Sequence, residues 1–415
     1  MISRCVLAGI LVAGLLVPAT VRGRVAGNAS ANGKTGSATI IQHFLIIGQS
    51  LAAGEEGSPG LSTSPGLYNN LRFAGGVFYP SSRATVVSIT EASNRETISS
   101  GFAHQLSALQ IAGGVPYPPA ALLASWGVDG TVYSGLKKGT QPYTDSLAGV
   151  TSAATIYPAP ILRVPAILVV HGEGDGDTAT YGGNLTEWQS DYQSDIQAIT
   201  GQATAIPFLY SQMANSSTFL GMLPNYEASP STMILVGPKY FLPYHDNGTH
   251  PLNTTYRTLG EYYGKAYYHA VVLGDPWNPL RPSTITRSGV TVTVQLTGQV
   301  GDIVNGCTAP GAVVTDPDGA GCTHCPLGFE WSDSTSSAYV SSVTISDATA
   351  GIITVTLNTT PTGNSKALRY AYSSTGVKGV TTGRRGCIRD SDTTSGVLDG
   401  VTLQNWLVHF NKSVN

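Results

Sequence analysis

Charged side chains are scarce in this sequence. They make up 11% of the 415 residues, whereas about 25% is typical of soluble proteins. Lys and Arg number 22, Asp and Glu number 25, and the net charge is only −3, so neither sign prevails. Such a composition argues against nucleic acid and acidic membrane lipid as partners, because both require a concentrated positive surface.

The sequence also lacks an apolar run long enough to span a membrane. The stretch Cys5–Val17 has 13 apolar residues, and a spanning helix needs about 20. This stretch follows Arg4 and ends before a small-residue cleavage pattern, which predicts a secretory signal peptide over residues 1–23. Residues 24–38 are small and polar and are predicted to form a flexible leader. We therefore expect a secreted, extracellular protein without a membrane segment.

Cysteine is rare, and removal of the signal peptide takes Cys5 with it. The remaining cysteines are Cys307, Cys322, Cys325 and Cys387. In an oxidising compartment this even number predicts two disulfides, for which three pairings are possible. The alternative is a zinc site, because Cys322-Thr-His-Cys325 has the spacing of metal ligands. Seven sequons are candidate glycosylation sites in a eukaryotic host: Asn28, Asn184, Asn215, Asn247, Asn253, Asn358 and Asn411.

Residues 39–275 alternate short apolar runs with helical patterns, and we found no internal repeat and no glycine-rich phosphate loop. Two segments show helical spacing, Leu185–Thr200 with a capping box of Asn184 and Glu187, and Thr254–Val272. This alternation predicts a mostly parallel sheet with helices on both faces. The predicted strands are Thr39–Ile47, Ala84–Ile89, Ala120–Trp126, Ala166–Val170, Pro207–Gln212 and Met233–Gly237.

The pattern changes at the proline-rich segment 276–283, which is predicted to be a linker. Beyond it, residues 284–415 alternate apolar residues with Thr and Ser at period two, which predicts an all-β sandwich. The predicted strands there are Val290–Leu296, Tyr339–Ile345, Ile352–Leu357 and Ala367–Tyr372. The sandwich is interpreted as a packing partner of the first domain or as a carbohydrate-binding module. The candidate sugar platform is Trp331, Tyr339, Tyr370, Tyr372 and Trp406.

A nucleophile and a base are expected at the carboxyl ends of the parallel strands, where open α/β sheets place their sites. Ser50 follows the first strand directly, beside Gly48, and can expose its hydroxyl at the turn. His250 is the candidate base and Asp246 the candidate acid that orients it. His245 competes for either role.

Two further clusters follow strands and are candidates for binding a developing oxyanion. The turn from Gly127 to Gly130 offers a backbone N–H, as Ser50 does, and the run from His171 to Asp175 offers a side chain. The alternative for Glu173, Asp175 and Asp177 is a solvated acidic loop or a calcium site.

The order of these clusters resembles the SGNH hydrolase superfamily, and within it the sialate O-acetylesterase-like branch, over roughly residues 40–275. Gly48-Gln49-Ser50 resembles the first block, which carries the nucleophile and one oxyanion N–H. Gly130 is the preferred match for the oxyanion glycine of the second block, and His171-Gly-Glu173-Gly-Asp175 is similar to the third.

The last block of that family carries the acid and the base, and Asp246 to His250 matches it. Its Asp usually stands three residues before the His, a place that Asn247 holds here, so Asn247 is the alternative partner of His250. The resemblance implies a flavodoxin-like three-layer domain and a serine esterase that needs no cofactor and acts on acetylated carbohydrate or another small ester. The alternatives are a non-catalytic glycan-binding protein on a hydrolase fold and a lipid or aryl esterase of the same superfamily.

Overall fold

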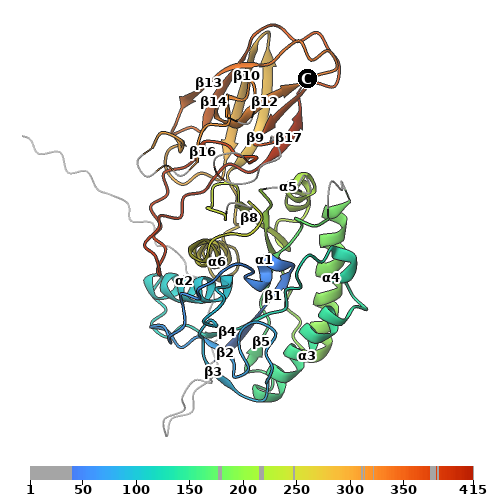
Figure 1. The fold of residues 1–415 in the computed structure, drawn as a ribbon, viewed down its shortest axis with the longest axis vertical. Coiled ribbons are helices and arrows are strands. Elements are labelled where there is room, and N and C mark those ends of the chain that lie inside the picture. The colour runs from blue at the N-terminus through green and yellow to red at the C-terminus, as the bar shows by residue number, and fades with distance from the viewer. Residues whose placement is uncertain are drawn as a thin grey trace, which may run out of the picture. The chain divides into compact units, whose positions relative to one another are not determined.

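A computed structural model describes residues 40–175, 180–214, 219–245, 248–309, 312, 314–320, 322–373, 380 and 383–414. The predicted signal peptide and leader lie outside these residues. The first part of the described chain is built on an eight-stranded sheet of order β3-β2-β4-β1-β6-β7-β8, with β5 paired to β1 (Figure 1). Its strands are β1 (Ile41–Gly48), β2 (Leu71–Phe73), β3 (Val86–Ser88), β4 (Ala120–Ser125), β5 (Leu162–Arg163), β6 (Ile167–Val170), β7 (Phe208–Gln212) and β8 (Met233–Pro238).

The strands of this sheet pair in parallel, apart from the antiparallel pair β2 and β3. All six residues of β4 are buried, as its continuous apolar run predicts for a central strand. The strand expected at Ala84–Ile89 differs, because β3 lies at the edge of the sheet and Val87 is 41% exposed. The mostly parallel α/β fold predicted from the sequence is confirmed.

Helices cover both faces of the sheet (Figure 1). Helix α2 packs against α6 and β4, whereas α3 packs against α4 and β1. The helices are α1 (Ser50–Ala53), α2 (Ile98–Ala112), α3 (Gln141–Ile156), α4 (Tyr181–Thr200), α5 (Phe219–Ala228) and α6 (Asn253–Tyr267), with short turns at Tyr133–Gly135, Tyr268–Leu273 and Pro326–Gly328. Buried apolar side chains of the helices and the strands belong to one hydrophobic cluster, which continues into the C-terminal part of the chain.

Helix α4 begins earlier than the sequence pattern predicts. Its first residue is Tyr181 and its N-cap is Thr180, and the N–H of Asn184 already donates to the carbonyl oxygen of Thr180 at 3.1 Å. The predicted capping box of Asn184 and Glu187 is therefore wrong, since Asn184 lies inside the first turn.

The second part of the described chain is antiparallel β structure. Strands β13-β14-β10-β9 form one sheet, β12-β15-β17 a second, and β11-β16 a third. In β10, Val292, Val294 and Leu296 are buried between more exposed neighbours, as period two requires. The strands are β9 (Arg281–Ser288), β10 (Thr291–Thr297), β11 (Val304–Asn305), β12 (Phe329–Ser332), β13 (Val340–Asp347), β14 (Ile352–Leu357), β15 (Ala367–Tyr370), β16 (Ile388–Arg389) and β17 (Phe410–Ser413).

The proline-rich segment between the two parts is packed against the first part. Trp277 is 7% exposed and its Nε1 donates to the carbonyl oxygen of Leu235 at 2.8 Å, and Leu280 is fully buried. Strand β9 begins at Arg281, within the segment expected to be a linker. The preceding helical segment already ends at Gly274, which has φ 71°, and the apolar residues between the prolines join the core.

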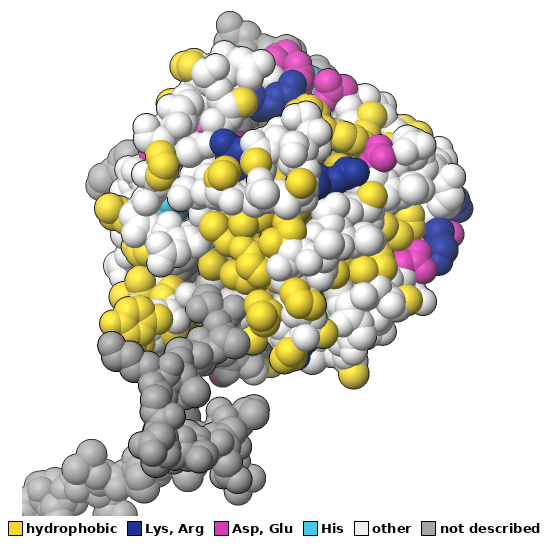
Figure 2. Space-filling view, turned by 90° about the horizontal axis from the view of Figure 1, so that it is seen from below, with side chains coloured by type: hydrophobic (Ala, Val, Ile, Leu, Met, Phe, Trp, Pro, Cys, Tyr) yellow, Lys and Arg dark blue, Asp and Glu magenta, His cyan; other side chains and the backbone are white. Residues whose placement is uncertain are grey.

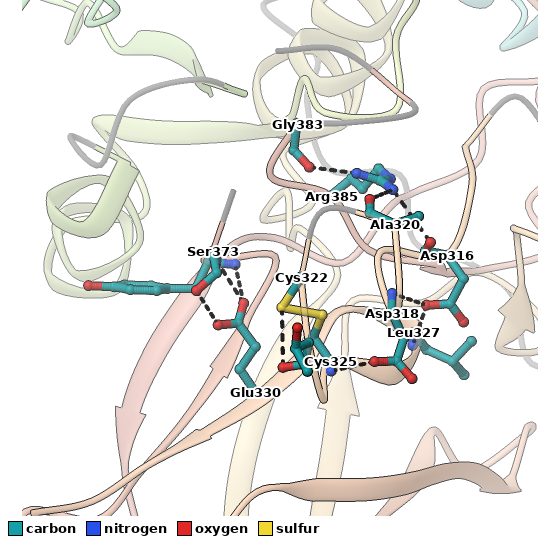
Figure 3. Close-up of a disulfide and its surroundings, with 12 residues drawn as sticks. Asp316, Asp318, Ala320, Cys322, Cys325, Leu327, Glu330, Ser373, Gly383 and Arg385 are labelled. Carbon is teal, nitrogen blue, oxygen red and sulfur yellow. Dashed lines mark hydrogen bonds between the residues drawn. A yellow bond between two sulfur atoms is a disulfide. The ribbon is translucent and has the colours of Figure 1, made fainter. Parts of the chain in front are cut away.

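The four remaining cysteines form two disulfides, Cys307–Cys387 and Cys322–Cys325. Figure 3 shows the second one in a loop that Asp318 and Arg385 organise: Asp318 accepts from the N–H of Cys325 at 3.0 Å, and Arg385 donates to Ala320 at 2.7 Å. A disulfide leaves no thiolate for zinc. Within the described residues, no group of three or more His, Cys, Asp or Glu is placed to hold a metal ion.

The surface agrees with the low charge of the sequence. In the view from below, Lys, Arg, Asp and Glu are few and scattered among uncharged side chains (Figure 2). In the part of the chain that the structure describes, no helix is both long and apolar enough to cross a bilayer.

Candidate functional site

Ser50 stands where β1 turns into α1. The preceding Gly48 has φ 143°, and a Cβ there would lie 2.0 Å from the carbonyl oxygen of Val170 on the neighbouring strand. Only glycine can make this turn at that distance. Ser50 itself is 5% exposed, so the tight turn places its hydroxyl in a nearly buried position at the end of the sheet.

His250 reaches Ser50 from a loop 200 residues further along the chain. Its Nε2 lies 3.0 Å from the Ser50 Oγ. The loop is closed by backbone bonds, since the N–H of His245 donates to the carbonyl oxygen of His250 at 3.0 Å. Helix α6 begins three residues after His250 and anchors the end of the loop. The 3.0 Å between the His250 Nε2 and the Ser50 Oγ is a separation that allows proton transfer from a serine hydroxyl to an imidazole.

The other ring nitrogen of His250 faces Glu56. Nδ1 lies 3.2 Å from the Glu56 Oε1, and the two side chains are 17% and 39% exposed. Glu56 has φ 58°, in the left-handed region, and follows α1 by three residues. Sequence reasoning missed Glu56. The available signal was its place six residues after Ser50, close enough in the chain to return to the same site.

Three other residues, His245, Asp246 and Asn247, were predicted to lie near His250. His245 was the competing candidate for base or acid, and its Nε2 instead lies 3.0 Å from the backbone oxygen of Glu56. Asp246 and Asn247, the two predicted partners of His250, lie outside the described residues. Among the residues that the structure describes, the carboxylate of Glu56 lies beside the imidazole.

Gln49 joins the first cluster to the third. Its Oε1 accepts from the N–H groups of Gly172 at 3.4 Å and Gly174 at 3.1 Å. The side chain thus holds the backbone of the third cluster beside the nucleophile turn.

His171 and Asp175 join the third cluster to the second. His171 is 1% exposed, its Nε2 lies 3.1 Å from the carbonyl oxygen of Thr131, and its Nδ1 lies 2.6 Å from the Tyr181 hydroxyl. Burial lowers the pKa of His171 and keeps the ring neutral. Asp175 accepts from the N–H of Tyr133 at 3.1 Å. These two predicted oxyanion candidates bind other parts of the protein.

Glu173 forms a buried ion pair with Lys239, whose side chain is fully buried. With Glu173 paired to a lysine and Asp175 bound to a backbone N–H, these carboxylates are engaged by the protein, and Asp177 lies outside the described residues. The predicted calcium alternative finds no cluster of ligands within the residues that are described.

The second cluster lies directly against α1. A Cβ on Gly127 would lie 2.4 Å from the backbone nitrogen of Ala53, and the N–H of Val128 donates to the carbonyl oxygen of Gly48 at 3.0 Å. Gly130 has φ 63°, and a Cβ on it would meet open space. Four segments far apart in the sequence therefore meet at one edge of the sheet, as the strand order requires.

Comparison with solved structures identifies the same fold elsewhere. A carbohydrate acetylesterase from Xanthomonas citri matches with a TM-score of 0.55 at 14% identity, over 89% of this chain and 80% of its own. This share is too large for the α/β part alone. The chain therefore has the fold of a carbohydrate acetylesterase.

Other solved structures match over a smaller share of the chain. A protein from Arabidopsis thaliana has a TM-score of 0.42 at 14% identity, over 55% of this chain and 97% of its own. The protein NanS has a TM-score of 0.37 at 11% identity, over 52% and 80%. A scan against protein-family descriptions and a search of curated protein sequences return no match.

Proposed function

We propose that this protein is a secreted serine esterase that removes acyl groups, chiefly O-acetyl groups, from carbohydrate. The observation that carries the proposal is the 3.0 Å approach of His250 Nε2 to Ser50 Oγ at the carboxyl end of the sheet. The fold shared with a carbohydrate acetylesterase supports the choice of substrate class. The fold alone does not establish activity, so the proposal depends on these two side chains.

In the proposed reaction, the Ser50 Oγ attacks the ester carbonyl carbon while His250 Nε2 takes the hydroxyl proton. The tetrahedral intermediate collapses, the bond to the sugar oxygen breaks, and His250 gives its proton to that oxygen. Water then attacks the carbonyl carbon of the acyl-enzyme while His250 takes its proton. The bond to the Ser50 Oγ breaks, His250 returns the proton to that oxygen, and the carboxylic acid is released. All atoms come from the ester, the enzyme and one water molecule, and the reaction needs no cofactor.

The proposed role of Glu56 is to position His250. For Nε2 to accept the proton of Ser50, the neutral imidazole must carry its own proton on Nδ1. A carboxylate 3.2 Å from Nδ1 favours that tautomer and stabilises the imidazolium formed during attack. Asp246, and Asn247 as its alternative, remain sequence-based candidates for the same role.

The proposed oxyanion donors are backbone N–H groups. Ser50 supplies one, and Gly130 is the proposed second because its cluster lies against the nucleophile turn. Backbone donors held by a rigid loop need no reorganisation during the reaction, which is the basis of their effect. Gln49, Gly127, His171, Glu173 and Asp175 are proposed to keep the loops that carry these donors in place.

The test measures release of the acyl group from para-nitrophenyl acetate and from acetylated oligosaccharides. We expect Ser50→Ala and His250→Ala each to lower kcat at least roughly 10³-fold, with unchanged melting temperature. Ser58→Ala, in the neighbouring loop, is the control. Activity that survives in Ser50→Ala contradicts the proposal. A wild-type protein that hydrolyses no acyl ester but binds glycan would establish the non-catalytic alternative.

A further inference from the structure

A cavity of about 470 Å³ opens beside the loop that carries His250, but neither His250 nor Ser50 lines it. Its described walls come from four places: residues 241–243 before the loop, the first two thirds of α6, Gly306 with Ala312, and the segment from Arg389 to Trp406. The volume falls within the roughly 300–1,000 Å³ that ligand pockets usually have. The proposed chemistry at Ser50 does not use this cavity.

The cavity is tied to the catalytic loop by direct hydrogen bonds. The hydroxyl of Thr255 and the N–H of Leu252 both donate to the carbonyl oxygen of Pro243, at 2.8 Å and 3.4 Å. Pro243 and Thr255 line the cavity, and Leu252 follows His250 by two residues. These bonds join a wall of the cavity to the segment that follows His250.

One side of the cavity is aromatic. The rings of Phe241 and Trp406 stack at a centroid distance of 4.9 Å and an angle of 5°, and Tyr262 packs against Phe241 at 5.4 Å. All three residues line the cavity. Aromatic side chains of this kind contact the C–H groups of a sugar ring while excluding water.

The other side is polar and contains the guanidinium of Arg389, which feels the charge of Asp390 but forms no ion pair among the described residues. Arg389 makes one side-chain hydrogen bond, from Nη1 to the carbonyl oxygen of Asp390 at 2.7 Å, and within the described parts of the chain it has no ion pair. The one carboxylate that lines the cavity, Asp399, is paired with Arg257 at 2.5 Å.

Arg389 therefore presents unused donors to the cavity in a partly buried setting. Burial lowers the pKa of its guanidinium, which shows that water solvates the charge incompletely. A partly desolvated guanidinium gains most from oxygen acceptors with fork-like spacing, such as neighbouring hydroxyls of a sugar. Thr258 and Gln404 supply further polar groups around it.

We propose that this cavity binds a second sugar unit of the glycan whose ester is hydrolysed at Ser50. The inference rests on the proposed esterase function for its choice of ligand. An aromatic wall, a guanidinium with donors left over among the described residues, and polar side chains are together what a hydroxyl-rich ring requires, and Pro243 links the cavity to the loop that carries His250. The protein is thereby selective for oligosaccharides over single sugars.

The kinetic test compares Arg389→Met with Arg287→Met. Arg287, on β9, also donates to one backbone carbonyl, at 2.9 Å from Gly289, but lies outside the cavity. We expect Arg389→Met to raise KM for an acetylated trisaccharide roughly tenfold, the loss of a charged hydrogen bond, and to leave kcat and all constants for para-nitrophenyl acetate unchanged. Arg287→Met should match the wild type on both substrates.

A second variant guards against a folding defect in Arg389→Met. Val401 lines the cavity and is 45% exposed, so Val401→Trp fills the space without removing a buried group. It should raise KM for the trisaccharide and spare para-nitrophenyl acetate. Equal KM values for the trisaccharide in wild type, Arg389→Met and Val401→Trp would overturn the assignment.

Direct binding separates this inference from the proposed function. Calorimetric titration of Ser50→Ala protein with the deacetylated trisaccharide involves no hydrolysis. Binding that is lost in Ser50→Ala/Arg389→Met supports the cavity even if the wild type proves inactive on every ester. If the wild type hydrolyses esters but Ser50→Ala and Ser50→Ala/Arg389→Met bind the trisaccharide equally well, the proposed role of the cavity is wrong and the proposed esterase function is unaffected.

Discussion

At the scale of single residues, His250 lies beside a carboxylate from a loop far from its own, since its Nδ1 is 3.2 Å from the Glu56 Oε1. Glu56 stands six residues after Ser50, and backbone bonds hold its loop: the N–H of Glu55 donates to the carbonyl oxygen of Ser50 at 3.0 Å, and the N–H of Gly57 to that of Gly54 at 3.0 Å. The same short segment therefore supplies both Ser50, the proposed nucleophile, and the neighbour of His250, the proposed base.

Replacement of Glu56 tests this arrangement. We expect Glu56→Gln to lower kcat roughly 10²-fold or more. A neutral amide stabilises the imidazolium less than a carboxylate does, and its NH2 group can donate to Nδ1, which favours the wrong imidazole tautomer. Steady-state kinetics on para-nitrophenyl acetate measure it. Glu55→Gln is the matched control, since Glu55 pairs with Arg95 at 3.2 Å and should change kcat little. If Glu56→Gln keeps a near-normal kcat while Asp246→Asn or Asn247→Ala loses most of it, the residue that orients the His250 imidazole lies in the loop of His250 itself.

At the scale of elements, the start of α2 is built on two buried carboxylates. Glu96 is fully buried and accepts from the N–H groups of Leu61 and Ser62 at 2.7 Å and 2.9 Å. Glu91 is 5% exposed, and its Oε1 accepts from the hydroxyls of Thr97 and Ser100, each at 3.0 Å. Burial, and secondarily the charge of Glu96, raises the pKa of Glu91 from 4.5 to about 8. The loop before α2 thus contains an acid that is protonated at neutral pH.

Glu91 should make the protein less stable as pH rises. Between pH 4.5 and about 8 the folded state holds a proton on Glu91 that the unfolded state releases, so the free energy of unfolding falls across this window. Glu91→Gln keeps the acceptor and removes the titration. Melting temperatures of wild type and variant should agree near pH 4.5 and diverge by pH 9, with the variant higher. Parallel curves over this range would show that Glu91 does not titrate in this way.

At the scale of the whole molecule, the two parts of the chain share buried polar contacts. Lys265 on α6 is 1% exposed and donates to Asp392, to the carbonyl oxygen of Leu403 and to Asn405, at 2.6 Å, 2.6 Å and 2.9 Å. The red C-terminal segment of Figure 1 also runs down to α2, where Gln105 donates to the carbonyl oxygen of Ser395 at 3.2 Å. The chain from Ala38 onward forms one compact unit.

Loss of Lys265 should weaken the whole protein. We expect Lys265→Met to lower the free energy of unfolding by roughly 3–5 kcal/mol, because it leaves Asp392 buried without its cation. Urea denaturation should show one transition in both proteins. Lys412→Met removes a more exposed pair with Glu227 and should cost at most about 1 kcal/mol. Two separate transitions in the wild type would show that the parts unfold independently, against the expectation drawn from these contacts.

Elements with strong local patterns were predictable, and those that depend on packing were not. Strands β4 and β14 match their apolar or alternating runs closely, because burial imposes those patterns directly. The start of α4 was misjudged because Gly182 and Gly183, poor helix formers, belong to its first turn. There a Cβ on Gly182 would lie 2.7 Å from the carbonyl oxygen of Gly221, so contact with α5 selects glycine. Packing outweighed propensity.

The sequence by itself determined the fold class and the meeting of Ser50 with His250, because the carboxyl ends of parallel strands share one edge whatever the details of the loops. It also predicted two disulfides among the four remaining cysteines, with a zinc site as the alternative. Only the tertiary structure decided that Cys307 pairs with Cys387, that Glu56 faces His250, and that Arg389 enters a cavity beside α6. These contacts join segments whose separation leaves no periodic trace in the chain, so they exist only once the loops are packed.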